Sequence, residues 1–183
     1  MILSGNEIVN NLENKIIIEP FNISQLNPNS YNLTLHNELV VYKNDIIDVR
    51  TKNDTETIYI PDDGYMLIPG QLYLARTCEH TETHGYVPAI QGRSSVGRLG
   101  ITVHISAGFG DVGFCGYWTM QLTCVKKTII YPKMKICQIY YHEINGDIDN
   151  YASKKYQDST VIQASKLYSE ITSAVLGSEN ECV

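Results

Sequence analysis

Short runs of β-branched and aromatic residues, each bounded by Asn, Asp, Gly or Pro, make up much of this 183-residue chain. Runs of this length and spacing indicate strands joined by tight turns, as in an all-β sandwich or barrel. Strands are expected at residues 15–19, 39–42, 46–49, 57–60, 66–68, 72–76, 101–105, 118–125, 128–131 and 136–142. The pattern therefore predicts an all-β fold, mainly strands with short helices.

One segment near the amino terminus has the signature of a helix. Ser4 and Glu7 have the spacing of a capping box, whose side chains satisfy free N–H groups in a first helical turn. Ile8, Val9 and Leu12 follow and supply apolar side chains. We expect this to be the firmest helix of the chain.

Length and composition are those of one compact domain. A chain of this length with 43% hydrophobic residues can bury a core without disulfide bonds or structural metal ions. The last dozen residues are small and polar, as in a mobile tail. We therefore expect a single domain over residues 1–171 and a mobile tail over residues 172–183.

Charge and cysteine content argue against several classes of protein. The net charge of −6 is unlike that of a nucleic-acid-binding surface, which is normally basic. The five cysteines are an odd number without C-x-x-C spacing or a cleavable signal sequence, which indicates reduced cytosolic thiols. No apolar run approaches the roughly 18 residues of a membrane span. We expect a cytoplasmic protein with neither nucleic acid nor membrane as partner.

Four candidate phosphate ligands lie within six positions of the chain: Arg93, Ser94, Ser95 and Arg98. Phosphate oxygens accept hydrogen bonds from guanidinium and hydroxyl groups, most strongly when the donor is charged. Neighbouring glycines let the backbone turn tightly and present N–H groups to an anion. Taken alone, the motif fits either a polyphosphate site or a surface turn with an incidental basic pair.

The residues that follow favour the phosphate interpretation. His104 and Ala107 lead into a Gly-Phe-Gly run, after which Asp111 stands between glycines at the expected end of a strand. Gln121 comes ten positions later, within an alternating run over residues 117–122. We interpret residues 89–122 as parts of a nucleotide pocket with Asp111 as a buried acid, although a turn cap is the simpler role for that aspartate.

These residues resemble the dCTP deaminase branch of the trimeric dUTPase superfamily. Its pattern, roughly G-R-S-S-x-x-R followed by H, D-x-G-F-x-G and T-L-E, is similar to this chain from Gly92 to Gln121. Agreement extends to the amino terminus, to residues 29–33, to a Y-P-x-M-x-I-x-Q strand at residues 131–139 and to K-Y-Q at residues 155–157. The resemblance spans about residues 1 to 168. The chain also resembles the bifunctional dCTP deaminase/dUTPase members of the family.

The resemblance implies a fold, an assembly and a set of ligands. The fold is a distorted jelly roll or β-barrel, assembled as a homotrimer with each active site built from more than one subunit. The nucleotides are dCTP, dUTP and dTTP, and Mg²⁺ is held through the triphosphate and water because this hard ion keeps its hydration shell. The implied substrate-binding residues are Arg93, Ser94, Ser95, Arg98, His104, Ala107, Asp111, Gln121, Tyr151, Lys155 and Gln157, and the implied catalytic positions are Ser94, Arg98, Asp111 and Gln121.

Three residues depart from the family pattern. Gln121 stands where the deaminases carry the glutamate that activates water, Asn32 replaces an aspartate, and Ser159 replaces a glutamine of some members. A glutamine can hydrogen-bond a pyrimidine edge but cannot accept the water proton, so deamination is expected to be impaired. Both a deliberately neutralised glutamate and a natural member that binds without deaminating fit this residue.

Three functional hypotheses therefore fit the sequence. The first is a zinc-independent dCTP deaminase, with the product dUTP or dUMP, impaired at Gln121. The second is a dUTP diphosphatase, in which Asp111 orients the attacking water. The third is a catalytically silent nucleotide-binding protein on the same scaffold.

A histidine-rich stretch at residues 80–84 resembles a metal site. His80 and Glu82 form the H-x-E of zinc deaminases, but the P-C-x-x-C element that supplies their remaining ligands does not follow. The four-residue spacing of His80 and His84 suits a helix, whereas this stretch is expected to follow a strand. We therefore expect no zinc.

Overall fold

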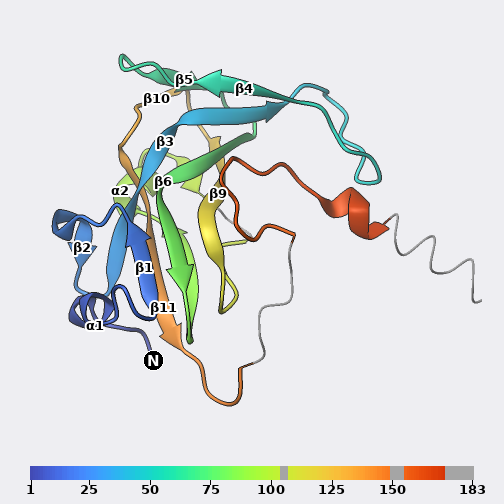
Figure 1. Cartoon of the computed structure of the whole chain (residues 1–183). Coiled ribbons are helices and arrows are strands. Elements are labelled where there is room, and N and C mark those ends of the chain that lie inside the picture. Colours follow the sequence, from blue (N-terminus) through green and yellow to red (C-terminus); the bar gives the residue numbers. More distant parts are fainter. Residues whose placement is uncertain (104–106, 149–154, 172–183) are drawn as a thin grey trace, which may run out of the picture.

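The computed structural model describes residues 1–103, 107–148 and 155–171. Within them, helices α1 (Gly5–Asn10) and α2 (Ser94–Gly97) and the 3-10 helix η1 (Ile23–Gln25) accompany a mainly β architecture (Figure 1). The strands are β1 (Ile16–Glu19), β2 (Leu26–Asn27), β3 (Ser30–Tyr42), β4 (Thr55–Tyr59), β5 (Tyr65–Leu67), β6 (Tyr73–Thr83), β7 (Tyr86–Gly92), β8 (Ile101–Val103), β9 (Cys115–Cys124), β10 (Thr128–Ile130) and β11 (Lys135–Glu143).

Nine strands form one antiparallel sheet, ordered β7-β11-β3-β6-β9-β8, with β1 beside β6 and with β2 and β4 beside β3. The pair β5 and β10 forms a separate small sheet. The register shifts where β6 meets β3 and β9, and such irregularities bend strands and increase their twist. Along one edge of β6, the first half of the strand pairs with β3 and the second half pairs with β1. β9 pairs with β6 along the other edge. The candidate site lies on β6 and β9.

The inner face of β9 is anchored in the core. Met120 and Leu122 are fully buried, and Trp118 donates its indole N–H to Thr81 Oγ1 at 2.9 Å. Burying a large apolar side chain contributes about 1.5–3 kcal/mol, which fixes the rotation of the strand about its axis. Because side chains alternate along a strand, the residues between these three point to the opposite face.

The predicted amino-terminal helix is confirmed as α1. Ser4 Oγ accepts the backbone N–H of Glu7 at 3.2 Å, and Ile8 is fully buried. The other half of the predicted capping box is replaced, because the Glu7 carboxylate accepts from the Asn10 side chain at 3.2 Å.

The strand predicted at residues 46–49 is wrong. This stretch is a loop in which Asp48 N donates to Asn53 Oδ1 at 3.1 Å and Arg50 N donates to Asp48 Oδ1 at 2.9 Å. Local side-chain bonds of this kind compete with a strand ladder for the backbone. Ile46 is 84% exposed, so its apolar character gives no core contact that would favour the strand.

Other elements differ from the sequence prediction in extent. β6 continues past the predicted end at residue 76 to Thr83, so His80 and Glu82 lie within the strand rather than after it. β7 was not predicted, and Pro88 is tolerated there because β7 is an edge strand of the main sheet. Residues 94–97, where the neighbouring glycines predicted a tight turn, form the short helix α2.

Residues 155–171 form what we call the closing segment, and its part over residues 157–163 lies along β9 (Figure 1). Tyr117 N donates to Ser159 O at 3.0 Å, and Gln163 N donates to Thr119 Oγ1 at 3.1 Å. Gly116 has φ +141°, and a Cβ at that position would be 2.9 Å from Ser159 N. The close approach of the closing segment to β9 therefore requires glycine at position 116.

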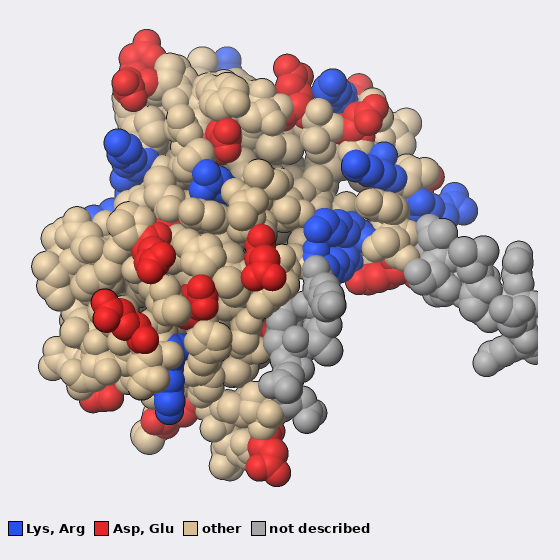
Figure 2. Space-filling model, in the orientation of Figure 1, with Lys and Arg blue, Asp and Glu red and all other residues tan. Residues whose placement is uncertain are grey.

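Charged residues are interspersed on the face shown in Figure 2, where Lys and Arg side chains lie among Asp and Glu rather than in one continuous basic stripe. None of the helices in the described part of the chain has the length and apolarity needed to cross a bilayer.

Candidate functional site

A cavity of about 550 Å³ lies against the outer face of β9, and we call it the Gln121 pocket. Its volume is within the range of ligand-binding clefts. Its lining comes from the loop before β9, from β9 itself, from residues near β3 and β6, and from the closing segment. The lining residues are Tyr42, Leu72, Leu74, Ala107, Phe109, Gly110, Asp111, Phe114, Tyr117, Trp118, Thr119, Gln121, Tyr156, Ser159, Gln163 and Ser165.

Strand alternation brings Gln121 into this pocket. Its neighbours Met120 and Leu122 are in the core, so Gln121 extends from the outer face, directly opposite Leu74 of β6. Its side-chain oxygen Oε1 is buried and accepts no hydrogen bond from any described residue. A buried polar atom without a partner costs about 1–3 kcal/mol, so this oxygen is suited to accept a hydrogen bond from a ligand.

Asp111 reaches the same pocket from the loop between β8 and β9. Two backbone bonds hold this loop against β7: Ile90 N donates to Gly108 O at 2.7 Å, and Gly110 N donates to Pro88 O at 2.9 Å. The predicted burial of Asp111 is wrong, because the residue is exposed in the structure. Ala107 lines the same wall, as predicted for the site.

The closing segment supplies the remaining wall. Tyr156, Ser159, Gln163 and Ser165 line the pocket, and Ser165 N donates to the hydroxyl of Tyr42 at 3.1 Å. The segment therefore connects β9 with the end of β3 across the pocket.

Lys155 and Gln157 belong to the closing segment but do not line the Gln121 pocket. Gln157 Oε1 accepts from Cys115 N at 3.2 Å, and Gln157 Nε2 donates to Gly113 O at 2.8 Å, so it anchors the segment to the start of β9. Lys155 forms an ion pair with Glu170 at 2.5 Å. In this structure both side chains stabilise the segment itself.

A second, more polar cavity of about 470 Å³ contains the predicted phosphate motif, and we call it the Arg93 pocket. Arg93, Ser94 and Ser95 line it at the end of β7 and the start of α2. Arg93 Nη1 donates to Lys135 O at 3.1 Å, which fixes the guanidinium beside β11. The other lining residues are Asn27, Asn32, Gln91, Gly92 and Gln138.

Asn32, one of the departures from the family pattern, supports the Arg93 pocket. Its side-chain amide donates to Gln25 O at 3.0 Å and to Asn27 Oδ1 at 3.1 Å. An ionised aspartate could donate neither bond. The buried Glu79 stabilises the same region, because its carboxylate accepts from Gln25 Nε2 at 3.0 Å and from Thr34 N at 2.8 Å.

The structure thus divides the predicted site into two groups. The Gln121 pocket holds Gln121, Asp111 and Ala107, and the Arg93 pocket holds Arg93, Ser94 and Ser95. The two pockets share no lining residue, and Arg98, the exposed carboxy-terminal cap of α2, lines neither. His104, Tyr151 and the predicted tail over residues 172–183 lie outside the described residues.

Several lining residues were not predicted. Thr119 and Tyr117 alternate with core residues on β9, so the strand period could have identified them together with Gln121. Tyr42 and Gln163 come from distant segments, and no local pattern in the sequence relates them to the site.

Among the described residues, an antiparallel β-barrel-like sheet carries a cavity of ligand-binding size with an unpartnered amide oxygen and a nearby carboxylate, features typical of small-ligand-binding β proteins. Residues 2–144 match the dCTP deaminase-like family model. The chain is 57% identical over 170 residues to a Clostridium beijerinckii protein named dCTP deaminase, dUMP-forming, covering 93% of this chain and 98% of that relative. A Hathewaya histolytica protein of the same name is 56% identical, with 93% and 99% covered.

The fold is also found in a solved structure. The 2'-deoxycytidine 5'-triphosphate deaminase from Agrobacterium tumefaciens superposes with a TM-score of 0.62 at 16% identity, covering 76% of this chain and 47% of that one. The chain belongs to the dCTP deaminase-like family. Both the family and the mainly β, dUTPase-like fold class predicted from the motifs are confirmed.

Proposed function

We propose that this protein binds dCTP in the Gln121 pocket and is a dCTP deaminase whose deamination step is impaired by glutamine at position 121. The observation that carries the proposal is the buried Gln121 oxygen without a partner inside a nucleotide-sized cavity. Relatives named dCTP deaminase, dUMP-forming, at 57% and 56% identity support dCTP as the nucleotide.

The chemistry explains why position 121 decides the rate. In deamination, water adds to C4 of cytosine, N3 takes a proton, and ammonia leaves from the tetrahedral intermediate. A carboxylate can accept the water proton and return it, whereas the Gln121 amide carries no group that titrates near neutral pH. The amide still offers both a donor and an acceptor to the pyrimidine edge. Binding is therefore retained while proton transfer is lost, at a cost of about 10²–10⁴-fold in rate.

The triphosphate needs ligands that the Gln121 pocket does not supply. Its described lining includes no Lys or Arg, while Arg93, Ser94 and Ser95 line a separate pocket. We propose that a second copy of the chain brings its Arg93 pocket to the Gln121 pocket of the first, within a homotrimer. Arg98, exposed at the end of α2, would then contact the phosphates as well.

Hydrolysis of dUTP is the second candidate function. Asp111 is an exposed carboxylate on the wall of the same pocket, where it can orient a water for attack on a phosphate. It is also the only carboxylate among the described lining residues, which fits Mg²⁺ held mostly by triphosphate oxygens and water. In this reaction the ion would neutralise phosphate charge.

Restoring the carboxylate tests the proposal. Gln121→Glu supplies the missing proton acceptor at nearly unchanged size, so ammonia release from dCTP is expected to rise by at least about 100-fold. The parent chain is expected to bind dCTP in calorimetry. The control is Gln163→Glu, which adds the same charge to the wall of the same pocket and is expected to give no increase.

Two outcomes would overturn deamination as the function. If Gln121→Glu binds dCTP without releasing ammonia while the parent hydrolyses dUTP to pyrophosphate, dUTP hydrolysis takes its place. If neither dCTP nor dUTP binds, the Gln121 pocket is not a nucleotide site.

A further inference from the structure

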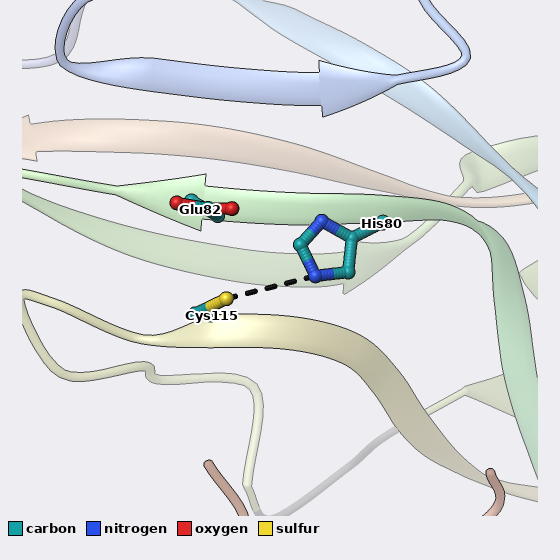
Figure 3. Close-up of side chains that lie close together, drawn as sticks. All are labelled: His80, Glu82 and Cys115. Carbon is teal, nitrogen blue, oxygen red and sulfur yellow. Dashed lines mark hydrogen bonds between the residues drawn. The ribbon is translucent and has the colours of Figure 1, made fainter. Parts of the chain in front are cut away.

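A cluster of three metal-ligating side chains lies on the sheet outside both pockets. His80 and Glu82 alternate along β6 and therefore share one face of the sheet, and Cys115 of β9 lies directly opposite Glu82 (Figure 3). The sequence pattern alone did not reveal this cluster, because Cys115 is 33 positions beyond Glu82 along the chain, and β6 was expected to end before His80.

The spacing of the donor atoms is that of a metal site. One imidazole nitrogen, one carboxylate oxygen and the Cys115 sulfur lie within 4.8 Å of one another. Cys115 Sγ is 3.6 Å from His80 Nε2. A tetrahedral Zn²⁺ with usual Zn–S and Zn–N bond lengths separates its sulfur and nitrogen ligands by about 3.6 Å. The strand pairing therefore already sets the sulfur and nitrogen at the separation that zinc requires.

The types of donor select the ion. A thiolate favours Zn²⁺ and similar borderline-soft ions, and a mixed sulfur, nitrogen and oxygen set excludes a preference for Mg²⁺ or Ca²⁺, which take oxygen ligands. All three side chains are half-buried, so an ion could enter from solvent while the sheet keeps its ligands in place. We propose that His80, Glu82 and Cys115 form a binding site for Zn²⁺ that is separate from the nucleotide pocket.

The position of the site indicates what the ion would do. The side chain of Gln157 and the backbone of Asp158 both hydrogen-bond to the backbone of Cys115, which places the start of the closing segment beside this cysteine. Tyr117, which lines the Gln121 pocket, packs its ring edge-to-face against His80 with centroids 5.4 Å apart. An ion at this site would link β6 to β9 at the point where the closing segment docks. Its role would be structural, so the deamination chemistry remains independent of zinc.

Cobalt spectroscopy on the untagged, metal-free full chain tests the proposal. Co²⁺ is expected to bind one equivalent per chain with tetrahedral ligand-field bands and a near-ultraviolet thiolate-to-cobalt charge-transfer band. Zn²⁺ is expected to displace it, with a Kd below about 1 μM, and to raise the unfolding temperature. Cys115→Ser is expected to abolish the charge-transfer band, and His80→Asn to weaken Zn²⁺ binding at least about 10-fold.

The matched control is Cys78→Ser. It removes a different half-buried thiol, which lies on β6 outside the cluster, and is expected to leave the spectrum unchanged. Mass spectrometry of the wild-type chain requires no variant. With alkylation continued at mildly alkaline pH until Cys115 of the metal-free chain is labelled, Zn²⁺ is expected to protect Cys115 and leave the labelling of Cys78 unchanged. A charge-transfer band that persists in Cys115→Ser, a band lost in Cys78→Ser, or alkylation of Cys115 unaffected by Zn²⁺ would each overturn the site.

Discussion

Glutamine and glutamate at position 121 fill almost the same space, but only the carboxylate can take a proton from water. The structure surrounds this residue with a complete strand, a docked closing segment and a buried acceptor atom. Under the proposed function, the exchange of one atom thus separates binding from catalysis. Such a protein would hold its nucleotide substrate long enough for the complex to be isolated.

Cysteine 115 illustrates a second effect at the residue scale. Burial, together with the nearby Asp158 and Glu82 carboxylates, raises the pKa of its thiol to about 12. The metal-free side chain is therefore protonated at neutral pH and is a poor nucleophile. Burial also raises the pKa of the fully enclosed Cys137.

Arg98 provides a prediction at this scale. It is exposed at the end of α2 and lines neither pocket of the single chain, so its removal should not disturb the fold. If it binds phosphate, Arg98→Ala is expected to weaken dCTP binding by about 1.5–3 kcal/mol, the range for charged hydrogen bonds. Calorimetry with dCTP measures the change, and Arg50→Ala, at another exposed arginine, is the control. Equal affinities of the two variants would remove Arg98 from the site.

At the scale of elements, the sequence predicted strands well where apolar alternation and turn residues coincide, as at β9 and β11. It failed where the determinant is not local. β7 contains a proline that is acceptable only because the strand lies at the edge of the sheet. Residues 46–49 are apolar apart from Asp48 but pair with no described strand, and local side-chain bonds determine their backbone instead.

The candidate site shows the same division. The motifs and the family resemblance predicted Gln121, Asp111 and the Arg93 segment as site residues, and their types are those that phosphate and pyrimidine recognition would use. Which of these residues share a cavity depends on pairing between distant strands, and the sequence alone contains no such distances. For this reason the separation of the two pockets became visible only in the structure.

The closing segment carries a prediction of its own. Truncation after Asn150 is expected to leave a folded core, because the buried apolar core lies within residues 3–141. Affinity for dCTP is expected to fall at least about 10-fold, since four lining residues of the Gln121 pocket are removed. Thermal unfolding and calorimetry measure the two properties.

Truncation after Ile171 is the control for this experiment, because it keeps the closing segment and removes only residues 172–183. Affinity close to that of the parent is expected for this shorter deletion. Tight binding by the chain that ends at Asn150 would instead assign the segment to packing alone.

At the scale of the whole molecule, the proposed function makes a complete site a property of the assembly, because the two pockets are separate in a single chain. We expect that mixing two inactive variants restores activity, because an intact Asp111 from one chain can meet an intact Arg93 from another. The variants are Arg93→Ala and Asp111→Asn, both in the Gln121→Glu background, unfolded and refolded together in equal amounts. Random assembly combines the two intact halves in about a quarter of sites, if each site uses two chains.

The measurements are ammonia release from dCTP and pyrophosphate release from dUTP, each compared with either variant refolded alone. A site contained within one chain would gain nothing from mixing. Absence of recovery, with assemblies of normal size, would therefore contradict the proposal that two copies complete the site.

Gly116 has a consequence for the history of this protein. Because the backbone of Ser159 lies where a side chain at position 116 would begin, any larger residue there is incompatible with the closing segment in its present place. Gly116 of β9 and Ser159 of the closing segment are 43 positions apart in the chain. Because of their contact, the sequences of the strand and the segment are constrained to change together during evolution. In a newly read genome, the residue aligned with Gly116 would indicate whether that relative can fold its carboxy-terminal region over the pocket in the same way.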